Sequence, residues 1–111
     1  MAATHAGEPF ERVDGAAGRR LFDDKSITWI DVREPAEWQQ VRIPGATLVP
    51  LNRLLVSPRQ YLQGDRVVFY CAQGIRSAVA CEVAASIGME KIYNLEGGIQ
   101  DWIAQGHPVE K

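Results

Sequence analysis

Short runs of apolar residues alternate with longer stretches of mixed polarity along the whole chain. Two of the runs, Ile27–Val32 (ITWIDV) and Arg66–Cys71 (RVVFYC), are nearly continuous and rich in β-branched and aromatic residues. A strand that is covered on both faces has this pattern, so these runs predict the central strands of a parallel sheet. Three other runs predict further strands, at Phe10–Val13, at Lys91–Leu95 and, after a turn, within Ile43–Val49.

The stretches that lie between these runs carry helical signals. The longest is Ser77–Ile87, whose apolar residues form one helical stripe that we expect to pack on the sheet: Val79, Ala80, Val83, Ala84 and Ile87. The predicted helices are Asp14 to about Asp23, Pro35–Gln40, Leu51–Leu55, Ser77–Ile87 and Gly98–Gln105. Strands and helices in alternation predict the α/β class with a parallel sheet.

Length and composition fit one ordinary globular domain. The chain has 111 residues, of which 46% are hydrophobic and 23% charged, and its formal net charge is −2. Lysine and arginine are scattered, which argues against nucleic acid and membrane surfaces as partners. Residues 1–9 lack the apolar core of a signal peptide, so we expect a flexible N-terminal segment, a single domain at 10–111 and a cytoplasmic location.

The cysteines and histidines restrict the possible chemistry. Two cysteines do not make a disulfide framework, and a helix between Cys71 and Cys81 would separate them by roughly 14 Å, whereas a disulfide needs Cα atoms within about 7 Å. We therefore expect free thiols, with Cys81 packed among small residues. The histidines, His5 and His107, lie near the two ends of the chain, so we predict no metal site and no cofactor.

Cys71 is the strongest candidate for chemistry. It ends an apolar strand, and Ala72, Gln73, Gly74, Ile75, Arg76 and Ser77 follow before the predicted helix. Loops at the carboxyl ends of parallel strands form ligand sites, and backbone amides with a helix N-terminus favour a thiolate. Ser77 is expected to cap the helix. The competing interpretation is that Cys71 is an inert buried thiol, which its residue type alone favours.

The absence of a histidine from this loop limits the type of reaction. A cysteine–histidine dyad of the protease kind would need a base that the loop does not offer. Sulfur transfer does not need one, because a thiolate attacks sulfane sulfur directly. The loop residues are therefore predicted to bind a sulfur donor around the nucleophile Cys71.

Four segments of the chain resemble the rhodanese family, in the order and at the spacing typical of that family. They are Ile30–Glu34, Ile43–Ala46, Cys71–Ser77 and Leu95–Trp102. The resemblance implies a five-stranded, mainly parallel sheet with helices on both faces. It also implies that Cys71 carries a persulfide, that the backbone amides of the loop hold this persulfide and the oxyanion of a donor such as thiosulfate, and that Arg76 is the loop arginine.

Three functions remain open at this point. The first is a sulfurtransferase that moves sulfur from thiosulfate or a persulfide to cyanide, glutathione or a protein thiol. The second is a non-enzymatic sulfur carrier or partner-binding module. The third is a Cdc25-like phosphatase or arsenate reductase, which we rank last, because such phosphatases hold five residues between cysteine and arginine whereas this loop has four. The oligomeric state is not predicted.

Charged residues near two other matching segments each allow two interpretations. Asp31 and Arg33 follow a predicted strand at the same edge of the sheet as Cys71, so they are either a charged second layer around the site or a structural ion pair. Many relatives carry Gly-His before the Ile43–Ala46 segment, where this chain has Val41 and Arg42. A solvated Arg42 is the favoured interpretation, and a position in the active-site pocket is the alternative.

Overall fold

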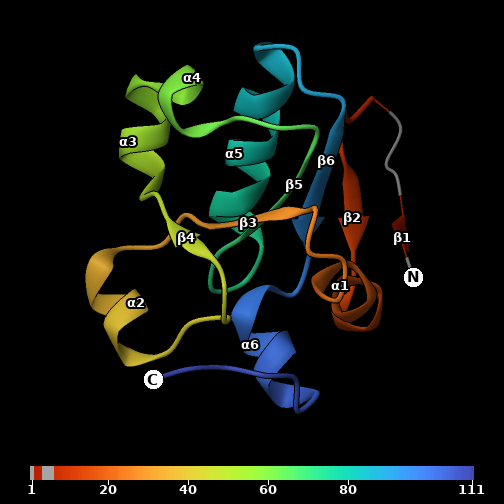
Figure 1. Ribbon diagram of the computed structural model, residues 1–111, viewed down its shortest axis with the longest axis vertical. Coiled ribbons are helices and arrows are strands. Elements are labelled where there is room, and N and C mark those ends of the chain that lie inside the picture. Colours follow the sequence, from red (N-terminus) through yellow and green to blue (C-terminus); the bar gives the residue numbers. More distant parts are fainter. Residues whose placement is uncertain (1, 4–6) are drawn as a thin grey trace.

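The computed structural model describes residues 2–3 and 7–111 and shows one sheet with six strands (Figure 1). Five of the strands are parallel and lie in the order β2, β6, β5, β3, β4, and β1 adds an antiparallel edge next to β2. Their bounds are β1 Ala2–Ala3, β2 Glu11–Val13, β3 Thr28–Asp31, β4 Thr47–Leu48, β5 Arg66–Tyr70 and β6 Lys91–Leu95. The predicted parallel five-stranded sheet is confirmed, and β1 is an addition to it.

Helices cover both faces of this sheet. The bounds are α1 Gly15–Phe22, α2 Pro35–Gln40, α3 Leu51–Val56, α4 Pro58–Tyr61, α5 Ile75–Ser86 and α6 Gly98–Ala104. Residues of α3, α4 and α5 belong to one apolar core, and residues of α1 and α6 belong to a second. The predicted α/β class with helices on both faces is therefore confirmed.

Strand β5 shows why its sequence is apolar throughout. Successive side chains of a strand point to opposite faces of the sheet. Accordingly, Val67 and Phe69 pack in the core with α3 and α5, whereas Val68 and Tyr70 pack in the core with α1 and α6. All four side chains are buried, as we predicted from the continuous run. Because β3 and β5 are parallel neighbours, the loops that follow them meet at one edge of the sheet.

Most predicted helices occupy the predicted residues. Helix α2 has the predicted bounds, and Asp14 caps α1 through a 2.8 Å hydrogen bond from the Ala17 amide to its side chain. The prediction for α5 was wrong in two respects. The helix begins at Ile75 after Gly74, so Ser77 lies in its first turn and is not the cap. Cys81 is buried, as we predicted, but Val79, which belonged to the predicted buried stripe, is 39% exposed.

Two remaining observations concern the ends of the chain and the membrane. The predicted flexible segment at 1–9 falls partly on residues 1 and 4–6, which lie outside the described residues. Within the described part of the chain, every helix is too short or too polar to span a lipid bilayer.

Candidate functional site

The loop that follows β5 curls around the Cys71 side chain. Gly74 makes this path possible, because its backbone has a φ of +92° and a Cβ atom at this position would lie 2.0 Å from the Glu96 carbonyl oxygen. L-residues with a side chain rarely adopt such a φ. The start of α6 holds the other side of the loop, where the Ile99 amide donates to the Cys71 carbonyl at 2.9 Å.

Two backbone amides donate hydrogen bonds to the sulfur of Cys71, and a hydroxyl lies beside it. The Gly74 amide lies 3.1 Å from Sγ and the Ser77 amide 3.4 Å, and the Ser77 hydroxyl, whose proton is donated to Asn94, also lies 3.4 Å from it. Burial disfavours the thiolate, since only 1% of Cys71 is exposed, but the hydrogen bonds from Ser77, Gln73 and Gly74 outweigh this effect. The pKa of Cys71 is therefore lowered from its ordinary value, which favours the thiolate form.

A buried asparagine, which we did not predict, fixes this arrangement from behind. Asn94 lies in β6, accepts a 2.6 Å hydrogen bond from the Ser77 hydroxyl and donates from Nδ2 to the Gly74 carbonyl at 3.1 Å. It thus joins the helix start and the loop glycine to the sheet. Asn94 is fully buried, but in the sequence it is a single polar residue within the predicted strand KIYNL, and no local pattern marks its role.

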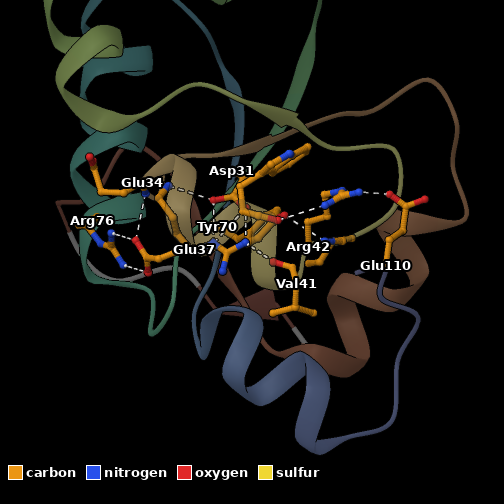
Figure 2. Close-up of polar contacts among 11 residues, drawn as sticks. Asp31, Glu34, Glu37, Val41, Arg42, Tyr70, Arg76 and Glu110 are labelled. Atoms are coloured by element: carbon orange, nitrogen blue, oxygen red, sulfur yellow. Dashed lines mark hydrogen bonds and ion pairs between the residues drawn. The ribbon is translucent and has the colours of Figure 1, made fainter.

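Arg76 is held by a residue that sequence reasoning also missed. Its Nη1 and Nη2 atoms donate to the two carboxylate oxygens of Glu37, at 2.8 and 3.0 Å (Figure 2). The hydrogen bond from Arg76 is the main reason why the pKa of Glu37 is lowered to about 2, so Glu37 is ionised at neutral pH. The arginine of the predicted donor-binding loop therefore already has an anionic partner on α2.

The remaining loop residues form the rim of the site. The Ala72 carbonyl accepts from the Gln100 amide at 3.2 Å, and the Gln73 side-chain amide lies 3.3 Å from that of Gln100. Ile75 is 72% exposed. These contacts tie one side of the rim to α6 and leave an apolar side chain on its surface.

Asp31 and Arg33 form a buried ion pair at the same edge of the sheet. Arg33 Nη2 lies 2.7 Å from Asp31 Oδ2 and donates at 2.7 Å to the Val41 carbonyl (Figure 2). The pair thereby connects the end of β3 to the end of α2. Because the described hydrogen bonds of the pair join these two segments, the structural role that we weighed for Asp31 and Arg33 is the better supported one.

In the described part of the chain, neither Arg42 nor Cys81 is among the residues that form hydrogen bonds with Cys71 Sγ. Arg42 Nε lies 3.4 Å from a carboxylate oxygen of Glu110, and its Nη1 donates to the Trp38 carbonyl at 3.1 Å (Figure 2). Cys81 is fully buried on the buried face of α5, and both cysteines are free, as we predicted. Burial raises the pKa of Cys81, so this thiol is inert.

Comparisons with known proteins agree with this geometry. A family model described as the rhodanese-like domain matches residues 16–105. A sulfurtransferase of Allochromatium vinosum is 34% identical over 91 residues, which cover 82% of this chain and 85% of that protein. A putative sulfur carrier protein of Bacillus subtilis, YrkF, is 29% identical over 84 residues, or 76% of this chain and 45% of that protein.

A solved structure shows the same fold. The crystal structure of a rhodanese-related protein from Thermoplasma volcanium superposes with a TM-score of 0.79 at 31% sequence identity. The match covers 89% of this chain and 96% of that one. The two chains therefore share the same overall fold over most of their length.

Proposed function

This chain belongs to the rhodanese-like domain family, and from this premise we propose that it is a sulfurtransferase in which Cys71 carries the transferred sulfur as a persulfide. The observation that carries the proposal is the position of Cys71 Sγ, which faces the amides of Gly74 and Ser77 at 3.1 and 3.4 Å. These donors favour the thiolate, which is the attacking form.

The reaction has two steps. In the first, the Cys71 thiolate attacks the sulfane sulfur of thiosulfate, a new S–S bond forms, and the bond to the sulfonate sulfur breaks with its electron pair leaving as sulfite. A persulfide donor reacts in the same way and leaves as a thiolate. In the second step, cyanide, glutathione or a protein thiol attacks the terminal sulfur and releases the Cys71 thiolate. The loop amides stabilise the anionic sulfur throughout.

Intact mass spectrometry tests the first step. Incubation with thiosulfate, or with glutathione persulfide, should add about 32 Da to Cys71, the mass of one sulfur atom. The addition should be lost on treatment with cyanide and should be absent from Cys71→Ala. Cys81→Ala is the matched control, because it removes the other free thiol and should still gain the sulfur. Sulfur transfer by Cys71→Ala at the wild-type rate would overturn the proposal.

A sulfur carrier is the second candidate, because a relative bears that name and Cys71 is almost completely buried. A carrier would acquire the persulfide from a donor and deliver it to a partner protein, with slow turnover of cyanide or glutathione. Steady-state kinetics therefore separate the two functions. Rapid Cys71-dependent thiocyanate formation supports the enzyme, and stable loading without turnover supports the carrier.

The location that we propose is the cytoplasm. Free cysteines persist in reducing compartments, and both Cys71 and Cys81 are free thiols. A low-pKa thiol that cycles through a persulfide also needs protection from oxidation. Fractionation of cells that contain the tagged protein tests this location, and recovery in an oxidising compartment would contradict it.

A further inference from the structure

The charge of the loop arginine is balanced by a neighbouring helix. Arg76 is the one basic residue between Cys71 and Ser77, and both of its terminal nitrogens donate to Glu37 in a fork-to-fork arrangement. The side chains of Arg76 and Glu37 are 36% and 34% exposed, so the pair lies at the rim of the site, where an incoming donor would meet it.

The other charged groups near Arg76 do not leave a net positive charge at the site. The hydrogen bond to Glu37 is the largest influence that raises the Arg76 pKa, and the charges of Cys71 and Asp31 raise it further. Asp31 is itself paired with Arg33 at 2.7 Å. The two arginines and the two carboxylates therefore sum to a formal charge of zero before the thiolate is counted.

From this arrangement we propose that Glu37 is a specificity-determining residue, which lowers the reactivity of the site toward the thiosulfate dianion and leaves organic persulfides as the preferred donor class. The inference rests on the proposed sulfurtransferase function. Thiosulfate brings two negative charges to a thiolate and therefore needs an unbalanced cation. A persulfide donor reacts in its protonated form R–S–SH, in which the transferred sulfur carries no charge, so it needs less cationic help.

The two donor reactions differ in the charge that must be brought together. With thiosulfate, a thiolate and a dianion combine, the sulfane sulfur moves to Cys71, and sulfite departs with two negative charges. With R–S–SH, the thiolate attacks the terminal sulfur, the new S–S bond replaces the old one, and R–S⁻ departs with the electron pair. In the persulfide reaction one negative charge is present before and after the transfer, so pairing Arg76 with Glu37 costs this reaction little.

Glu37→Gln tests the inference with little change in shape. Glutamine retains a carbonyl oxygen that can accept the 3.0 Å hydrogen bond from the Glu34 amide, so the start of α2 is preserved. The value of kcat/KM should rise for thiosulfate by about tenfold at low salt, the size expected when one charge acts on a dianion across several ångströms of partly solvated protein. For 2-hydroxyethyl persulfide, which carries no carboxylate, it should change less than about twofold.

Two further variants make the comparison specific. Glu90→Gln removes the same charge from an exposed position before β6, at the opposite edge of the sheet, and should leave both donors unaffected. In an Arg76→Gln background, Glu37→Gln should favour thiosulfate less strongly, because it then removes the repulsion by Glu37 without freeing a cation. An equal fall with both donors in Glu37→Gln would mean that Glu37 merely holds Arg76 in place, and would overturn the inference.

A second readout does not depend on sulfur transfer. Iodoacetate and iodoacetamide alkylate the same thiolate, but the first is an anion and the second is neutral. The ratio of their rates at Cys71, located by peptide mass mapping, should rise severalfold in Glu37→Gln and stay constant in Glu90→Gln. A rise without any sulfur transfer would contradict the proposed function alone, and an unchanged ratio in an active enzyme would contradict the role of Glu37 alone.

Discussion

At the scale of single residues, the backbone of Gly74 determines how the Cys71 thiol is presented. Its amide donates to Sγ at 3.1 Å, its carbonyl accepts from Asn94, and a Cβ would lie 2.0 Å from the Glu96 carbonyl oxygen. We predict that Gly74→Ala lowers the free energy of unfolding by about 3 kcal/mol, since it adds a steric clash to the unfavourable φ. Urea denaturation measures this loss, and alkylation of Cys71 should slow in parallel.

Gly64→Ala is the matched control for this prediction. Gly64 has a φ of +90°, nearly that of Gly74, but a Cβ at that position would meet no atom within 4 Å. Its substitution should therefore cost only the backbone strain, about 1 kcal/mol, and leave Cys71 reactivity unchanged. Equal losses in the two variants would show that the contact with Glu96 is unimportant.

Sequence reasoning at this scale succeeded where the signal was local. Cys71, Gly74 and the strand-to-helix turn could be placed because they follow one another in the chain. Glu37 and Arg76 are 39 positions apart, and Asn94 and Ser77 are 17 positions apart. A glutamate on a short helix and an asparagine in a strand have no distinguishing local pattern, so their contacts with the loop depend on how the sheet brings the segments together.

At the scale of elements, the buried pair of Asp31 and Arg33 fastens β3 to α2. Arg33→Met would leave the Asp31 carboxylate buried without its cation and would remove the hydrogen bond to the Val41 carbonyl. Breaking a buried pair from one side costs about 3–5 kcal/mol, so we predict a loss of this size in the free energy of unfolding. Asp31→Asn in the same chain should recover part of it, because the unpaired charge disappears.

The exposed pair of Arg66 and Asp24 provides the comparison. Its atoms are 2.6 Å apart, but its side chains are 30% and 41% exposed. Water stabilises the remaining carboxylate there, so Arg66→Met should cost much less than Arg33→Met. Urea denaturation of both single variants and of the double variant checks the prediction. A similar cost for Arg33→Met and Arg66→Met would argue against a fastening role for the buried pair.

The elements themselves were largely predictable because their signals are physical and local. Two-sided burial made β3 and β5 continuous apolar runs, and Pro35 and Asp14 marked helix starts. The start of α5 was misplaced, because we took Ser77 for a cap while the left-handed conformation of Gly74 already turns the chain into the helix. Helix α4 was missed, since its four residues are too few to show a helical period.

At the scale of the whole molecule, one apolar core contains two cysteines with opposite electrostatic surroundings. Cys71 and Cys81 both belong to the core that α3 and α5 cover. Cys71 lies at its edge, where the hydrogen bonds of the loop lower its pKa despite burial. Cys81 lies on the buried face of α5, where burial raises its pKa. The same fold therefore favours the thiolate of one cysteine and the neutral thiol of the other.

This contrast predicts opposite pH dependences of stability. The folded pKa of Cys81 is raised, so its contribution is complete below the unfolded value of about 8.5 and declines above it, because only the unfolded state then ionises. The stability advantage of the wild type over Cys81→Ala should shrink by roughly 2 kcal/mol between pH 7 and pH 10.

The folded pKa of Cys71 is lowered, so the contribution of its thiolate to stability is lost as pH falls through that value and is complete above the unfolded value. The advantage over Cys71→Ala should therefore grow across this range. Urea denaturation of the three proteins at several pH values measures both trends, and parallel curves would show that the two thiols share one environment.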